Sequence, residues 1–179
     1  MSDRTRCLLD KVTARRILEG LLKLAEGRDL GGDELFALDL FYRAGSHSIE
    51  LFIVPPTVHT LSRLEVLPRY GGIIRLLRDR MQVALPARYF TRWSRRLRDF
   101  GFTPEDAAVL ALGTFGTNES GTILGMDYIA TFDQPLIRHW ATQQGAIRER
   151  WQTMRDDLPA PYRDAPLPDV QPPEHIVIV

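Results

Sequence analysis

Hydrophobic residues along this chain follow two spacings, one typical of buried strands and the other of amphipathic helices. Short apolar runs predict strands at 6–9, 49–54, 82–85 and 128–133. Apolar residues that recur every three or four positions predict helices at 13–26, 33–44, 57–67, 73–80, 87–100, 104–113 and 135–155. Strands separated by helices favour an α/β fold with three layers (α/β/α), in which a mostly parallel central sheet lies between two layers of helices.

The pattern changes near the end of the chain. Residues 158–179 are rich in proline, show almost no helical spacing, and end in the apolar run 176–179. Proline-rich segments favour extended backbone. We therefore expect one α/β domain over 1–157 and an acidic, extended C-terminal tail over 158–179.

Composition limits the classes of partner and compartment. The 179 residues include 23 basic and 23 acidic side chains, so no global charge attracts nucleic acid or a membrane. Cys7 is the only cysteine, which excludes a disulfide within the chain and the common zinc-binding clusters. No apolar run approaches the length needed to span a membrane. We expect a cytoplasmic protein with no membrane partner.

Three aspartates are candidates for a metal site. Asp10 and Asp133 each end an apolar run, and Asp106 opens a helix between them. The carboxyl ends of parallel strands line one crevice, so these acids can meet despite their separation in sequence. Clustered carboxylates repel one another unless a cation neutralises them, which favours Mg²⁺ or Mn²⁺. Each aspartate has a purely structural alternative, because an acid in the first turn or at the cap of a helix stabilises that helix.

Three motifs together resemble the PIN domain. They are Leu8-Leu9-Asp10, the segment 102–111 (FTPEDAAVLA), and Thr131-Phe132-Asp133, in that order along the chain. The resemblance implies a metal-dependent ribonuclease whose catalytic, metal-binding acids are Asp10, Asp106 and Asp133, with Thr131 in a supporting role. It also implies RNA as substrate and a toxin role with an antitoxin-like protein partner, and we expect a homodimer.

Two positions depart from the family pattern. The family usually carries a glutamate early in the helix after the second strand, whereas residues 57–62 contain no acid. Glu65 lies more than one turn further on and is a candidate supporting residue if the helix starts later or bends. Lys11 follows Asp10 where a small hydroxyl residue or asparagine is frequent, and its charge could offset acid repulsion in place of a metal. These departures support an alternative, a catalytically degenerate PIN-like domain that binds RNA or a protein.

A basic segment offers a candidate RNA-binding surface. Residues 69–98 contain nine arginines and one acid, Asp79, with aromatic residues between them. Arginine pairs with phosphate and aromatic rings stack on bases, so the segment could contact RNA through Arg88, Arg92, Arg95 and Arg96. Alternatively, these arginines form only the solvent face of a helix whose aromatic residues pack in the core. The acidic tail could cover this surface, with residues 176–179 as an edge strand.

Overall fold

Five short strands form the centre of the computed structural model, which describes residues 4–46 and 48–177. The sheet order is β3-β2-β1-β6-β7, and every neighbouring pair is parallel. Their bounds are β1 Thr5–Leu9, β2 Ile49–Ile53, β3 Met81–Val83, β6 Tyr128–Ala130 and β7 Asp169–Gln171. Leu9 pairs with Ile53 on one side and Ala130 on the other, so β1 is the central strand.

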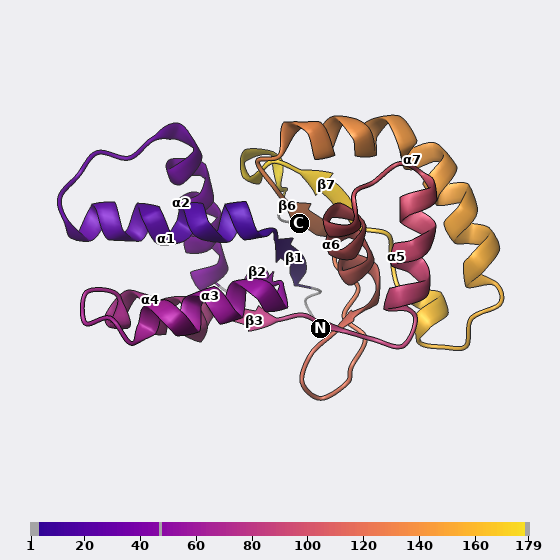
Figure 1. Cartoon of the computed structure of the whole chain (residues 1–179), viewed down its shortest axis with the longest axis horizontal. Helices are drawn as coiled ribbons and strands as arrows, with labels where there is room; N and C mark the ends of the chain where they lie inside the picture. The colour runs from indigo at the N-terminus through magenta and orange to yellow at the C-terminus, as the bar shows by residue number, and fades with distance from the viewer. Residues whose placement is uncertain (1–3, 47, 178–179) are drawn as a thin grey trace.

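Helices cover both faces of this sheet, as the apolar spacing predicts (Figure 1). The helices are α1 Lys11–Ala25, α2 Gly32–Gly45, α3 Pro55–Glu65, α4 Gly71–Arg80, α5 Phe90–Asp99, α6 Pro104–Phe115 and α7 Gln134–Arg155. Cys7 and Leu9 pack in the core shared with α1 to α4. Leu8 points to the opposite face and packs in the core shared with α5, α6 and α7. The three-layer α/β/α architecture is therefore confirmed.

Helix α6 lies very close to the sheet at Gly113, which has no side chain. A Cβ atom placed on Gly113 would lie 2.9 Å from Ile129 Cδ1 in β6 and 2.9 Å from Pro168 Cγ. Real Cβ contacts are longer than this, so only glycine fits at this point. The close packing holds the first turn of α6 beside the carboxyl ends of the strands.

The C-terminal segment corrects the expectation of a separate tail. Asp169–Gln171 forms β7, which pairs with β6, and the segment also buries apolar side chains, among them Leu158, Ala165, Val170 and Ile176. Prolines at 168 and 172 flank β7, so the sequence pattern does not indicate a strand there. An edge strand tolerates these prolines because its outer side needs no hydrogen bonds to a neighbouring strand. The edge strand expected at 176–179 is not formed by Ile176 or Val177, and residues 178–179 lie outside the described part.

Several boundaries also differ from the predicted ones. The strand expected at 82–85 divides into β3 and β4 (Leu85–Pro86). Strand β4 pairs antiparallel with β5 (Gly116–Thr117), which lies where no strand was predicted. The basic helix α5 begins at Phe90 instead of residue 87. Within the described ranges, no helix is long and apolar enough to cross a membrane.

Candidate functional site

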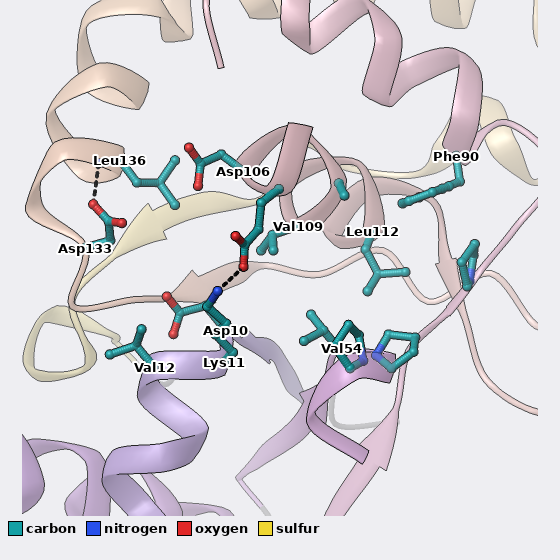
Figure 2. Close-up of a pocket in the computed structure, with 15 residues that line it drawn as sticks. Asp10, Lys11, Val12, Val54, Phe90, Asp106, Val109, Leu112, Asp133 and Leu136 are labelled. Carbon is teal, nitrogen blue, oxygen red and sulfur yellow. Dashed lines mark hydrogen bonds and ion pairs between the residues drawn. The ribbon is translucent and has the colours of Figure 1, made fainter. Parts of the chain in front are cut away.

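The three candidate aspartates line one pocket at the carboxyl end of the sheet (Figure 2). Asp10 lies between β1 and α1, Asp106 in the first turn of α6, and Asp133 between β6 and α7. The pocket has a volume of about 360 Å³. Residues separated by more than a hundred positions thus meet where the topology of a parallel sheet places ligand sites.

Asp10 is buried at the base of the pocket, and the protein itself binds both of its oxygens. Oδ1 accepts a hydrogen bond from the backbone N–H of Thr13 at 2.7 Å, and Oδ2 accepts one from the hydroxyl of Thr131. Burial raises the pKa of Asp10 above its usual range, the hydrogen bonds from Thr131 and Thr13 oppose this rise, and the charge of Asp133 adds to it. Asp10 is also the N-cap of α1.

Thr131 connects Asp10 to Asp133. Its hydroxyl is fully buried, donates to Asp10 and accepts from the backbone N–H of Asp133 at 3.0 Å. Asp133 is exposed, and its Oδ1 accepts from the backbone N–H of Leu136 at 3.0 Å, so it caps α7. The supporting position suggested for Thr131 matches this geometry, because one hydroxyl fixes the relative placement of two pocket acids.

Asp106 is half-buried and lines the pocket from the first turn of α6. Its Oδ2 accepts from the hydroxyl of Thr103 at 2.7 Å, and that same hydroxyl accepts from the backbone N–H of Asp106 at 3.1 Å. Thr103 is the N-cap of α6. Each of the three aspartates therefore stabilises a helix start and also lines the pocket, so the structural and functional interpretations are compatible.

Lys11 and Glu105 form an ion pair across the mouth of the pocket (Figure 2). Their side chains are 60% and 62% exposed. The hydrogen bond that the Lys11 ammonium donates to Glu105, together with the negative charge of Glu105, raises the pKa of Lys11 and keeps the ammonium charged. Lys11 thus lies beside the acids as expected, but its partner is Glu105, which the sequence did not indicate as a residue of the site.

Glu65 does not belong to this pocket. It is the last residue of α3, and its Oε2 binds Arg78 Nη1 at 2.9 Å. The pocket is lined near this helix by Pro55 and Pro56 from the first turn, with no acid. The supporting role suggested for Glu65 is therefore wrong for this arrangement, because α3 starts at residue 55 and carries Glu65 almost three turns away from the site.

The arginines of the basic segment point to solvent. Arg88, Arg92, Arg95 and Arg96 are all exposed, and Arg96 pairs with Asp99 at 3.8 Å. Trp93 and Leu97 are fully buried in the core, which removes Trp93 as a base-stacking residue. Phe90 is different, because it is only partly buried and lines the pocket.

The remaining wall of the pocket is apolar, a feature that sequence reasoning missed. Its residues are Val12, Val54, Pro55, Pro56, Pro86, Phe90, Ala108, Val109, Leu112 and Leu136. The available signal was the Pro55-Pro56 pair, which follows β2 and therefore lies at the same edge of the sheet as Asp10.

The donor atoms of the pocket suit a hard divalent cation, but the protein does not complete a metal site alone. Carboxylate oxygens are the ligands that Mg²⁺ and Mn²⁺ prefer. Among the described residues, no three His, Cys, Asp or Glu side chains are grouped closely enough to hold an ion. Asp106 Oδ1 and Asp133 Oδ2 accept no hydrogen bond within the same residues, so each oxygen is available to a ligand of the pocket.

Comparison with known proteins adds no family assignment. The chain matches no protein-family model, and a search of curated proteins found no match. The resemblance to the PIN domain stays a prediction that depends on the three motifs and on the order in which they occur.

Proposed function

We propose that this protein is a divalent-metal-dependent ribonuclease that hydrolyses RNA phosphodiesters in the acidic pocket. The main support is the convergence of Asp10, Asp106 and Asp133 from three separate elements on one pocket. The pocket lies at the carboxyl end of a parallel sheet, where such folds bind their ligands.

The protein's side chains divide the work between them. Asp106 and Asp133 would hold Mg²⁺ or Mn²⁺ through the oxygens that receive no hydrogen bond. The bound ion would lower the pKa of a water molecule and neutralise the phosphate. Asp10, fixed by Thr13 and Thr131, adds negative charge at the base of the pocket and keeps Asp133 in place through Thr131.

The spread of the acids agrees with a site that RNA completes. Mg²⁺ is often held by one or two carboxylates together with substrate phosphates and water. Lys11 is exposed at the mouth of the pocket, and an exposed ion pair contributes little free energy. Its ammonium can therefore leave Glu105 and bind an RNA phosphate instead. We therefore expect the ion and the RNA to bind more tightly together than either binds alone.

Cleavage of a mixed panel of single-stranded RNAs in Mn²⁺ tests this proposal. Asp133→Asn keeps an acceptor for the helix cap but removes the charge, so it should fold and lose at least about 100-fold in rate. Asp29→Asn makes the same change at an exposed loop position and should cleave like the parent. No cleavage by the parent, or equal cleavage by parent and Asp133→Asn, contradicts the proposal.

A second candidate is a PIN-like module that binds RNA without cleaving it. Two observations favour this second function. Glu65 forms an ion pair with Arg78 away from the pocket, so the pocket has no acid from α3. The ammonium of Lys11 lies beside the acids, where it offsets part of their negative charge. RNA binding without any cleavage would support this function. The toxin role, the antitoxin-like partner, the homodimer and the cytoplasmic location stay predictions from the sequence.

A further inference from the structure

The pocket has two chemically different ends. All five charged residues that line it, namely Asp10, Lys11, Glu105, Asp106 and Asp133, belong to the site already described, and the other ten lining residues are apolar. Figure 2 shows Asp133 and Asp106 at one end, Phe90 at the other, and Val109 and Leu112 between them. The hydrolysis proposed above uses the charged end and leaves the apolar end without a role.

We infer that the apolar end binds one unpaired nucleobase of the RNA, beside the phosphodiester held at the acids. This inference rests on the proposed function and specifies how that site engages its substrate. It makes the pocket a site for single-stranded RNA, because a base inside a duplex is paired and stacked and cannot enter.

The side chains at the apolar end suit contact with a flat ring. The phenyl ring of Phe90 and the pyrrolidine rings of Pro55, Pro56 and Pro86 offer rigid apolar faces. Unpaired bases bind proteins largely by stacking on such surfaces. The pocket volume of about 360 Å³ lies near the lower end of small-molecule sites, which run from about 300 to 1,000 Å³.

The lining also predicts how selective this subsite is. No polar side chain among the described lining residues belongs to the apolar end, so the protein has few groups there to read the edge of a base. Discrimination between bases relies on such hydrogen bonds. We therefore expect purines and pyrimidines to bind with similar strength.

Charge outside the pocket favours a nucleotide over a neutral apolar ligand. Arg88 and Arg92 stand two residues before and two residues after Phe90, and both are exposed. A strand whose base contacts Phe90 carries its phosphates close to this basic segment, where arginine can pair with them. An aliphatic side chain of a protein partner would gain nothing from these charges.

Binding of free nucleosides tests the subsite without metal or catalysis. Saturation-transfer NMR in EDTA would compare adenosine, uridine, D-ribose and cyclohexanol at equal concentrations. We expect transfer from protein methyl groups to the base protons of both nucleosides, and none to ribose. The probes carry no phosphate, so repulsion from the acids does not obscure the result.

A variant that fills the cavity provides the structural control. Ala108 of α6 lines the pocket, and Ala108→Met should weaken nucleoside binding by about tenfold or more. Ala141→Met introduces the same side chain at an exposed position of α7 and should bind like the parent. Phe90→Leu serves as a second variant if Ala108→Met fails to fold, with Phe36→Leu on the exposed face of α2 as its control.

The outcomes separate this inference from the proposed function. Nucleoside binding that Ala108→Met does not weaken, or equally strong binding of cyclohexanol, overturns the nucleobase subsite even if RNA cleavage depends on Asp133. Nucleoside binding that depends on Ala108, in a protein that cleaves no RNA, supports the subsite and rejects hydrolysis.

Discussion

The hydroxyl of Thr131 donates a hydrogen bond to Asp10 Oδ2, although 121 positions separate the two residues. Both residues are buried, and the contact joins the carboxyl ends of β1 and β6. The same hydroxyl accepts the backbone N–H of Asp133. A single side chain therefore sets the positions of two of the three pocket acids.

Removing this hydroxyl should weaken the fold and the site together. Thr131→Val keeps the shape of the side chain but leaves Asp10 Oδ2 and the Asp133 N–H without a partner. We expect a loss of about 1–3 kcal/mol in the free energy of unfolding, measured with urea. The pKa of Asp10 should rise further, because a hydrogen bond that lowers it is gone. Thr91→Val, at an exposed site, is the control, and equal stability of the two variants would contradict the prediction.

Burial of Asp10 makes stability depend on pH. Because its pKa is raised in the folded state, Asp10 holds its proton at pH values where the unfolded chain, with a pKa of about 3.9, releases it. The contribution to stability is present below about 3.9 and is lost as pH rises through the higher folded pKa. Asp10→Asn has no such titration, so its stability relative to the parent should increase over this window.

Urea unfolding in EDTA, from pH 3.5 to 8, measures this difference. Asp29→Asn changes an exposed loop residue and should show a flat difference from the parent across the same range. A difference between Asp10→Asn and the parent that stays constant with pH would refute a raised pKa at Asp10.

The exposed ion pair at the pocket mouth should affect metal affinity more than stability. Lys11→Met removes the only cationic side chain that lines the pocket among the described residues, and it should raise Mn²⁺ affinity about fivefold, or about 1 kcal/mol. Stability should change by less than about 1 kcal/mol, because both partners are exposed. Glu105→Gln removes an acid instead and should lower Mn²⁺ affinity. Calorimetric titration measures both, and shifts in the same direction would count against a cation site here.

The exposed arginines of α5 should bind RNA through its phosphates. Replacing both Arg92 and Arg95 with glutamine should weaken binding and lower the slope of log affinity against log salt by about 0.7 for each phosphate that arginine no longer neutralises. Replacing Arg148 and Arg150 of α7, which are also exposed, provides a control with the same change in net charge. Equal slopes for the two double variants would show that only net charge matters. Fluorescence anisotropy with labelled RNA gives these slopes.

Strand β7 should contribute substantially to stability although it contains only three residues. Val170 is 3% exposed, and Val170→Ala should cost about 1–2 kcal/mol of unfolding free energy, measured with urea. Val177→Ala, at a position that is 61% exposed, should change it by less than about 0.5 kcal/mol. Similar small effects of both variants would mean that β7 adds little to the core.

Sequence patterns predicted the acidic residues of the candidate site but not the apolar residues that line the rest of the pocket. They identified Asp10, Asp106 and Asp133 because each follows a strand or opens a helix, positions that topology brings to one edge. They missed Phe90 and the proline wall, since an apolar residue near a helix start looks the same whether it lines a pocket or the core. They also misjudged Glu65, because its direction depends on where α3 begins and on the distant Arg78.

The sequence by itself determined the α/β class and the approximate positions of the helices and of β1, β2 and β6, because helical spacing, strand runs and caps such as Thr103 act between residues close together in the chain. Only the tertiary structure decided that Asp169–Gln171 joins the sheet, that Trp93 is buried, and that Thr131 binds Asp10. These features depend on pairing between segments that lie far apart in the chain. A short stretch of sequence does not indicate which distant segment it will contact. The packing of the whole domain decides that contact.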